Sequence, residues 1–165
     1  MIKSKKRVRR CDVTEAYDID EIYMKEALTE AQKAELHGDV PIGCVIVFDG
    51  KIIAAAKNER ELDKNALRHA ELTAIEEACR VRGGWRLFGC TLYVTLEPCP
   101  MCAGAIVNSR ITRVVYGAKD PKAGAFGSVL NMNSYPLNHK PEIKSGVLAD
   151  ECSKMLRLFF AKLRK

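Results

Sequence analysis

Two short motifs, about thirty residues apart, set the strongest constraint on how this chain can fold. The first is His69-Ala70-Glu71 and the second is Pro98-Cys99-Pro100-Met101-Cys102. Together they offer one imidazole, two thiols and one carboxylate. Three protein ligands of these types can hold a zinc ion and leave a fourth position for water, which is typical of a catalytic zinc site. The fold must then bring His69, Cys99 and Cys102 together.

A structural zinc site would need a fourth protein ligand. His37 and His139 lie far from both motifs in the sequence, so neither is suitably placed. A Cys-x-x-Cys pair alone is often redox-active or structural, and an isolated His-x-Glu carries little information. Their coincidence, each at a predicted helix start, is much more specific and favours a catalytic zinc centre.

The length and composition indicate one globular domain. The chain has 165 residues, of which 47% are hydrophobic and 29% charged. No apolar run is long enough to cross a bilayer, and no apolar stretch follows the basic N-terminus as in a secretory signal. We therefore expect a cytoplasmic protein, with a mobile basic arm at 1–18 and a single domain at 19–165.

The cysteine count argues against a disulfide framework. Seven cysteines are present, an odd number, and only Cys99 and Cys102 are closely spaced. The others are expected to be small buried hydrophobic residues in a reducing compartment: Cys11, Cys44, Cys79, Cys90 and Cys152.

The formal net charge is +6, and the excess of basic residues lies at the two ends of the chain. A basic chain suits a polyanionic partner such as nucleic acid. Solvated tails that aid solubility explain the same charge, so composition leaves both interpretations open.

Apolar spacing and turn residues predict the order of elements. A helix starts near Asp18 or Asp20 and ends at Gly38, with an apolar face formed by Ile22, Tyr23, Ala27, Leu28, Ala31 and Ala34. Asp49-Gly50 predicts a hairpin between strands at 44–48 and 52–56. Beyond a loop at 57–68 we expect helices after His69 and Pro100, strands at 91–95 and 114–116, a long irregular segment at 118–138, and a final helix from Ala149. This order predicts a three-layer α/β domain with a mixed sheet.

Glu71 has the chemistry of a proton carrier, but its position is ambiguous. It lies two residues beyond His69, an offset of roughly 200° on a regular helix, so helical geometry alone does not direct it to the metal. An irregular first turn and a long side chain permit the approach. There Glu71 would move a proton from water to a ring nitrogen and then to a departing amine.

The zinc motifs resemble the H-x-E and P-C-x-x-C signature of the cytidine-deaminase-like zinc deaminases. Within that superfamily the chain is similar to the bacterial tRNA-specific adenosine deaminases. The similarity extends from about Tyr23 to Phe160 and includes the segments 40–43, 91–97, 103–106, 114–118, 127–128, 138–139, 146–148 and 159–160.

The resemblance implies a three-layer α/β/α cytidine-deaminase-like fold with a mixed central sheet. It also implies a homodimer that deaminates adenosine to inosine at the wobble position of the anticodon of arginine tRNA. It implies one Zn²⁺ per subunit, held by His69, Cys99 and Cys102, with Glu71 as proton shuttle. Asn58 would contact the base, or stabilise its own loop. Asp120 would contact the anticodon, or cap a turn.

Phe159 and Phe160 lie about 100° apart on a helix, so at most one can be in the core while the other stacks on an RNA base. Two residues depart from the family pattern: Arg68 stands where a small or apolar residue is usual, and Ala161 where a basic one is common. The charge of Arg68 must reach solvent or a phosphate.

Two other functions fit parts of the pattern. A guanine deaminase has a similar Glu-Pro-Cys-Pro-Met-Cys run, although the basic charge and the flanking residues favour the RNA substrate. A non-catalytic zinc-containing RNA-binding subunit is disfavoured because Glu71 is intact.

Overall fold

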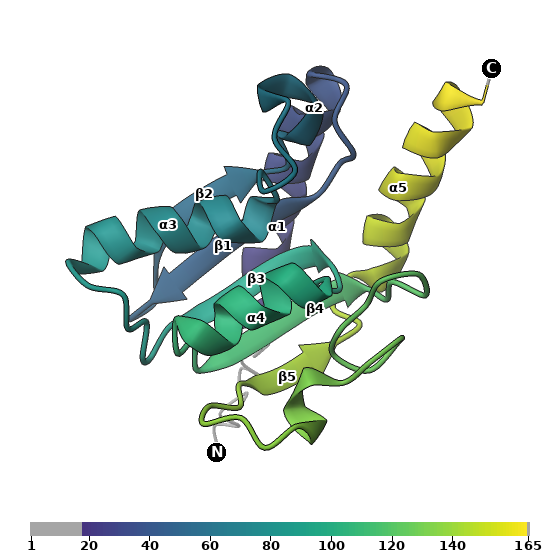
Figure 1. The fold of residues 1–165 in the computed structure, drawn as a ribbon. Coiled ribbons are helices and arrows are strands. Elements are labelled where there is room, and N and C mark those ends of the chain that lie inside the picture. The colour runs from purple at the N-terminus through teal and green to yellow at the C-terminus, as the bar shows by residue number, and fades with distance from the viewer. Residues whose placement is uncertain (1–17, 165) are drawn as a thin grey trace, which may run out of the picture.

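A five-stranded mixed sheet lies between two layers of helices in the computed structural model, which describes residues 18–164 (Figure 1). The strand order is β2-β1-β3-β4-β5. β1 pairs antiparallel with β2 and β3, whereas β3, β4 and β5 run parallel. The predicted three-layer α/β fold with a mixed sheet is therefore confirmed. The expected N-terminal arm, apart from Asp18, is outside the described residues.

The elements follow one another along the chain as α1 (Ile19–Leu36), β1 (Gly43–Phe48), β2 (Lys51–Lys57), α2 (Arg60–Asp63), α3 (Ala70–Arg82), β3 (Thr91–Leu96), α4 (Pro100–Asn108), β4 (Arg113–Ala118), the 3-10 helix η1 (Met132–Ser134), β5 (Glu142–Ser145) and α5 (Ala149–Leu163). Among the described residues, none of these helices combines the length and apolarity that a membrane crossing requires.

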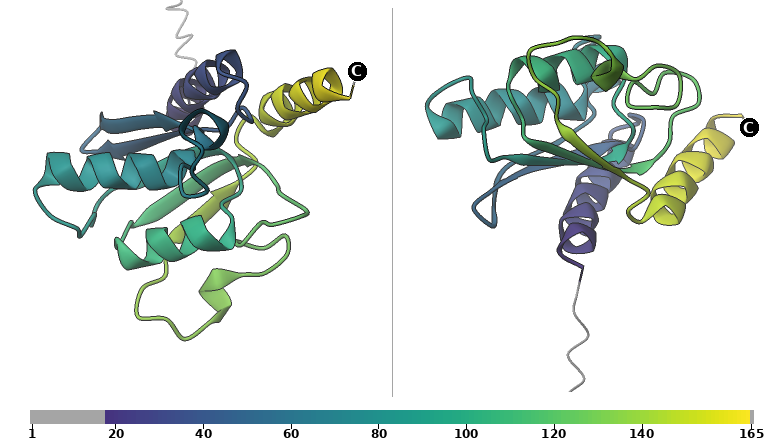
Figure 2. Two further views of the ribbon diagram at one scale, coloured as in Figure 1. Left: turned by 45° about the horizontal axis from the view of Figure 1, so that its top comes forward. Right: turned by 90° about the horizontal axis from the view of Figure 1, so that it is seen from below.

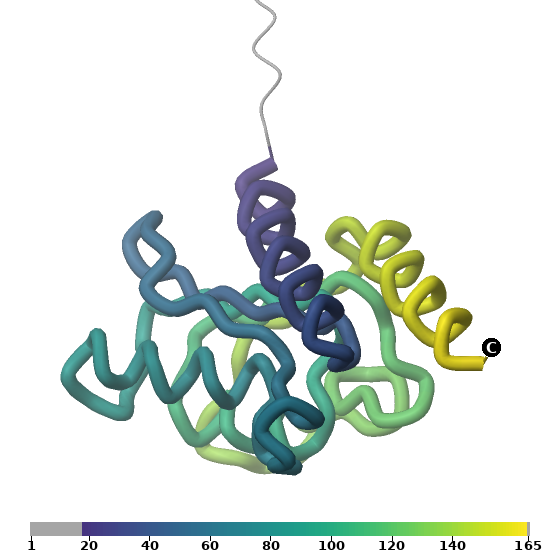
Figure 3. Tube along the Cα trace, turned by 90° about the horizontal axis from the view of Figure 1, so that it is seen from above, coloured from purple at the N-terminus to yellow at the C-terminus, as the bar shows by residue number. Residues whose placement is uncertain are grey.

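Helices α3 and α4 cover one face of the sheet, and α1 and α5 cover the other (Figures 2 and 3). Side chains along the central strand β3 alternate between the two cores: Leu92 and Val94 pack towards α3 and α4, and Tyr93 towards α1. Because both faces are covered, β3 is an almost continuous apolar run.

Local signals set the ends of several elements as predicted. Asp49 and Gly50 have φ of 49° and 70°, the positive values that a primed hairpin turn needs. The Asp18 carboxylate accepts a hydrogen bond from the Asp20 amide and caps α1. Gly38, with φ of 82°, follows the end of α1 as expected, and Gly83, with φ of 68°, has the same place after α3.

Three expectations of the sequence analysis are wrong in detail. Met24 is buried in α1, whereas Ile22 is 40% exposed. The side that faces the sheet is formed by residues at helical spacing, Met24, Ala27, Ala31 and Ala34, and Ile22 is not on that side. The segment 57–68 includes the short helix α2. Strand β5 was not predicted because it is a polar edge strand without an apolar run.

The scattered cysteines behave largely as expected. Cys44, Cys90 and Cys152 are buried and Cys79 is half-buried, all as free thiols. Cys11 is outside the described residues.

Two glycines allow the helices on one face to pack closely on the sheet. A Cβ atom on Gly43 would lie 2.0 Å from the Ala27 carbonyl oxygen in α1. A Cβ atom on Gly117 would lie 2.4 Å from the Cys152 Sγ in α5. Both helices therefore pack against strand backbone rather than against side chains at these points.

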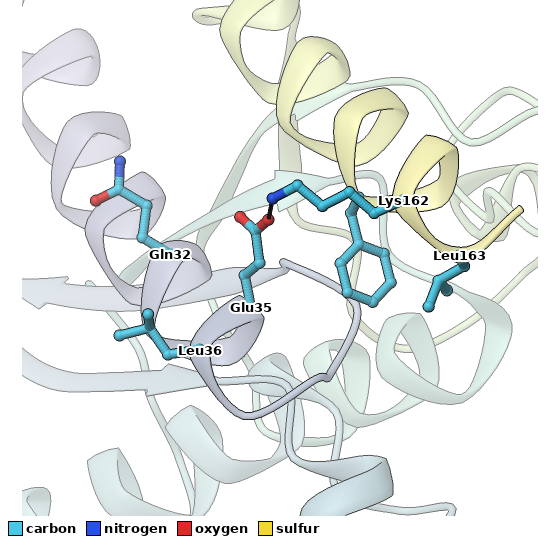
Figure 4. Close-up of a pocket in the computed structure, with 6 residues that line it drawn as sticks. Gln32, Glu35, Leu36, Lys162 and Leu163 are labelled. Atoms are coloured by element: carbon cyan, nitrogen blue, oxygen red, sulfur yellow. Dashed lines mark hydrogen bonds and ion pairs between the residues drawn. The ribbon is translucent and has the colours of Figure 1, made fainter. Parts of the chain in front are cut away.

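The C-terminal end of α5 lies beside the C-terminal end of α1, across a groove of about 750 Å³. Lys162 Nζ reaches Glu35 Oε1 at 2.6 Å and bridges the two helices (Figure 4). Phe159, which is buried, lines the same groove together with Leu36 and Leu163.

A buried carboxylate joins α1 to three strands. The Asp20 side chain is 4% exposed and accepts hydrogen bonds from Arg113 Nη1 at 2.8 Å, Lys144 Nζ at 2.5 Å and the Tyr93 hydroxyl at 2.8 Å. These donors come from β4, β5 and β3. The bond from Arg113, followed by those from Lys144 and Tyr93, holds the pKa of Asp20 well below its ordinary value despite the burial.

Because the folded state holds the Asp20 pKa below its unfolded value of about 3.9, its contribution to stability is present above that pH and is lost as the pH falls further. Asp20→Asn should lower the free energy of unfolding at pH 7 by about 3 kcal/mol, and should weaken the acid dependence below pH 4. Urea denaturation at several pH values measures both effects. Glu142→Gln, which removes a 70% exposed carboxylate from the same arginine, should have little effect.

Candidate metal centre and active site

The three predicted metal ligands meet where two helices begin. His69 is the N-cap residue of α3, and Cys99 is the N-cap residue of α4. Pro100 is in the first turn of α4, where its missing amide hydrogen is no loss, and Cys102 lies in the same turn. The partial positive charge of both helix ends favours thiolate over thiol.

The ligand atoms are close enough to share one ion. His69 Nδ1 lies 3.7 Å from Cys99 Sγ and 3.5 Å from Cys102 Sγ, and all three atoms are within 4.8 Å of one another. Zinc–sulfur bonds of about 2.3 Å and zinc–nitrogen bonds of about 2.0 Å at tetrahedral angles separate sulfur from nitrogen by about 3.5 Å. The cluster could therefore bind a metal ion, and its donors and spacing fit zinc.

The pKa values of the two cysteines also support a metal site. The hydrogen bond from the Cys102 thiol, with help from His69, lowers the pKa of Cys99 to about 4. The bond to Cys99, together with burial, raises the pKa of Cys102 well above its ordinary value. Two sulfurs this close cannot both ionise easily alone, whereas a divalent cation between them would allow it.

Glu71 lies at the same site. Its side chain is buried, at 4% exposure, and it lines a pocket together with His69 and Cys99. The offset that made its position ambiguous does not apply, because His69 has extended backbone angles (φ −78°, ψ 146°) and stands outside the helix. Burial raises the pKa of Glu71 to about 7, near neutrality, as suits a group that accepts and releases a proton.

The pocket beside these residues has a volume of about 200 Å³, smaller than the pockets that hold drug-sized ligands. Asn58 lines it and is 4% exposed. The Asn58 amide also donates to the Val40 carbonyl at 3.4 Å, so it stabilises its loop while it faces the pocket. Besides Asn58 and the three residues His69, Glu71 and Cys99, the pocket is lined by Val40, Ile42, Arg60, Leu96, Glu97, Asp120 and Ala123.

Asp120 lies at the rim of this pocket and caps a turn. Its Oδ1 accepts hydrogen bonds from the amides of Lys122 at 2.9 Å and Ala123 at 3.2 Å. The turn-capping interpretation of Asp120 is thus confirmed, and a contact with RNA stays a prediction.

Arg60 and Glu97 belong to the site but were not singled out in the sequence. Arg60 is the first residue of α2, in a segment that carried no periodic signal. Glu97 is 2% exposed between β3 and the metal motif. The signal that the sequence offered for Glu97 was an acidic residue directly before Pro98-Cys99, just after a predicted strand.

Of the two adjacent phenylalanines, one is buried and the other is exposed, as their positions on a helix predict. Phe159 is 6% exposed and Phe160 is 43% exposed. Phe160 lines a second cavity of about 470 Å³, which shares Val40, Leu96 and Asp120 with the smaller pocket. This cavity is bordered by four cationic side chains: Lys119, Lys122, Arg157 and Arg164.

Arg68 does not reach into the pocket. Its guanidinium pairs with Asp63 Oδ2 at 3.1 Å and Glu76 Oε2 at 3.6 Å, with the side chain 38% exposed. The departure from the family pattern at this position is therefore accommodated by surface ion pairs.

Comparison with known proteins identifies relatives over almost the whole chain. The MafB19-like deaminase family model matches residues 19–164. A tRNA-specific adenosine deaminase of Bacillus subtilis is 56% identical over 147 residues, covering 88% of this chain and 91% of the relative. A solved structure from a study of A-to-I editing by tRNA:A34 deaminases at the wobble position of transfer RNA has a TM-score of 0.80 and 44% identity, covering 82% of this chain and 99% of that one.

A guanine deaminase structure from Bacillus subtilis is also similar, with a TM-score of 0.57 and 34% identity. It covers 72% of this chain and 86% of the other. Both the identity and the TM-score are lower than for the tRNA:A34 deaminase structure.

Metal binding can be tested on stability alone. Zinc at a thousandfold excess over Kd should raise the free energy of unfolding of the metal-free protein by about 4 kcal/mol. Cys99→Ser should abolish this increase, because one of the three ligands is lost. Cys79→Ser changes a half-buried cysteine outside the cluster and should retain it. An equal response of the two variants to zinc in thermal melts would contradict the assignment.

Proposed function

The chain belongs to the MafB19-like deaminase family and to the tRNA-specific adenosine deaminases, and from this membership we propose that it hydrolyses adenosine to inosine at the wobble position of a tRNA anticodon. As the resemblance implies, the substrate is arginine tRNA. One observation carries the proposal: a buried carboxylate, Glu71, lines the same small pocket as the histidine and cysteine of the metal cluster.

The cofactor in this proposal is one Zn²⁺ per subunit, held by His69, Cys99 and Cys102. When bound, zinc supplies Lewis acidity, which lowers the pKa of a water ligand from nearly 16 to about 7. The donor types and their separations support zinc over Mg²⁺ or Ca²⁺, which prefer oxygen ligands.

The reaction adds water at carbon 6 of adenine, breaks the bond from carbon 6 to the amino nitrogen and releases ammonia. Glu71 accepts one proton from water and delivers it to a ring nitrogen. It then accepts the second proton from the hydroxyl group added at carbon 6 and delivers it to the departing amine, so inosine keeps one proton and ammonia takes the other. The Asn58 amide can donate to and accept from the edge of a purine, so it would hold the base against Glu71.

The pocket volume supports a single base as the reacting unit. A space of about 200 Å³ receives a nucleobase but not a stacked strand, so the nucleotide must leave its stack. An anticodon loop makes this easier than a duplex does. The loop residues Asp120 and Ala123 close one side of the pocket.

The neighbouring cavity supports RNA over a free base. Its four cations could contact phosphates on either side of the inserted nucleotide, and the exposed Phe160 could stack on a neighbouring base. Asp120, shared by the two cavities, would contact the anticodon where they join. Phe159, whose ring centroid lies 5.4 Å from that of Phe160, would support it by packing.

We also propose that the enzyme is a cytoplasmic homodimer, as the resemblance implies. Exposed apolar side chains outside the pocket, such as Leu67 at 59% and Val129 at 55%, are surfaces that a second copy could cover.

The direct test is incubation with an arginine-tRNA anticodon stem-loop carrying adenosine at the wobble position, with inosine measured as product. Wild type should convert it. Glu71→Ala should keep its zinc and lose at least about a hundredfold in kcat, because proton transfer contributes that much. Conversion of free guanine with none of the stem-loop would instead indicate a guanine deaminase, and undiminished turnover in Glu71→Ala would refute the assigned role.

A second prediction concerns the cavity bordered by the four cationic side chains. Arg157→Ala and Arg164→Ala should each weaken stem-loop binding and make it less salt-dependent, with a slope of log K against log[salt] smaller by about 1. Lys154→Ala removes an exposed cation from the same helix outside the cavity and is the matched control. Binding titrations at several salt concentrations measure the slopes. Identical slopes for the cavity variants and the control would place the RNA elsewhere.

A further inference from the structure

The irregular segment that follows β4 is fastened to a single carboxylate. Glu97 Oε1 accepts hydrogen bonds from the amides of Phe126 at 3.0 Å and Ser128 at 3.1 Å. Glu97 Oε2 accepts from the amide of Asp120 at 3.1 Å and from the Ser128 hydroxyl. Four donors from one loop thus end on a side chain that is 2% exposed.

These four bonds use the whole hydrogen-bonding capacity of the carboxylate. An ionised carboxylate has about four lone-pair sites on its two oxygens, and each site here has a donor. None of the four donors is a cation, so the negative charge is held by loop dipoles rather than by an ion pair. Although Glu97 borders the base pocket, its oxygens have no capacity left for a substrate.

The packing around Glu97 shows that the loop is shaped to it. A Cβ atom on Gly124 would lie 2.4 Å from both Cδ and Oε2 of Glu97, so only glycine fits at this position. The Ala125 amide donates to the Pro98 carbonyl at 2.9 Å, immediately before the first cysteine ligand. The loop is therefore tied both to Glu97 and to the segment that carries the metal ligands.

We propose that Glu97 is a positioning residue, whose carboxylate holds the loop at 119–128 so that Asp120 and Ala123 form one wall of the base pocket. Its effect on catalysis is through the loop rather than on the reacting atoms. The choice of substrate for the kinetic test rests on the proposed function, whereas the fastening of the loop does not.

Glu97→Gln tests the arrangement at a single atom. If the amide oxygen keeps the bonds to Phe126 and Ser128, the amide NH₂ faces the Asp120 N–H, while the Ser128 hydroxyl can turn and accept. The Asp120 end of the loop should therefore loosen, and the Phe126–Ser128 end should stay. Amide hydrogen exchange should accelerate at Asp120 at least tenfold more than at Phe126, in line with the loss of a hydrogen bond to a charged group.

The kinetic signature should separate positioning from general damage. With the anticodon stem-loop, Glu97→Gln should raise KM about tenfold, with a smaller change in kcat and unchanged zinc content, because the wall moves and the ligands do not. Gly124→Ala, which pushes the loop away from the same carboxylate, should reproduce this pattern. Ser128→Ala loses only the hydroxyl bond and should show a milder form. Glu26→Gln, at an exposed site on α1, is the matched control.

Three results would overturn the proposal: unchanged exchange at Asp120 in Glu97→Gln, loss of zinc together with activity, or wild-type KM in both Glu97→Gln and Gly124→Ala. A wild-type protein that is inactive on the stem-loop would refute the proposed function instead. Hydrogen exchange would still decide the role of Glu97 in that case, because it needs no substrate.

Discussion

The N-termini of α3 and α4 meet at the same end of the sheet, and the candidate site depends on that meeting. Each helix contributes a ligand from its N-cap position, His69 and Cys99, so the ligands stand on extended backbone while the helices behind them are rigid. The two helix ends also bring partial positive charge, which favours the ionised sulfurs that metal binding by this cluster would require. This geometry needs α3 and α4 on the same face of the sheet, as observed (Figure 2).

Two buried carboxylates stabilise that arrangement from opposite sides of the sheet, and by different physics. Asp20 accepts hydrogen bonds from charged side chains of β4 and β5. It therefore joins these two strands to α1 through strong but pH-dependent bonds. Glu97 gathers mostly backbone amides, so it fixes the path of a loop that lacks regular structure of its own. The first secures the fold, whereas the second secures a wall of the pocket.

The sequence predicted features whose causes are local. The hairpin follows from the φ values that Asp49-Gly50 permits, and the place of each ligand at a helix start follows from the residues next to it. The meeting of the two motifs was inferred from the set of ligands that zinc requires. The sequence could not predict other features that depend on distant partners. The role of Glu97 depends on hydrogen bonds from residues 120–128, which are distant in the sequence. Strand β5 forms because β4 offers an open edge, rather than because Glu142–Ser145 is apolar. Arg60 was missed for the same reason: only the folded loop directs it to the pocket.

Similarity to a guanine deaminase limits what the metal cluster can explain. Chains that share this fold and this kind of chemistry can differ in substrate, so the choice between adenosine in RNA and a free purine must depend on residues outside the ligand set. For the proposed RNA substrate, these residues would be the loop wall at Asp120 and the cationic side chains of the neighbouring cavity, because a free base would have no phosphates to contact there. Under the proposed function, substrate choice would therefore depend on the 119–128 loop and α5, while reactivity would depend on the residues at the two helix N-termini.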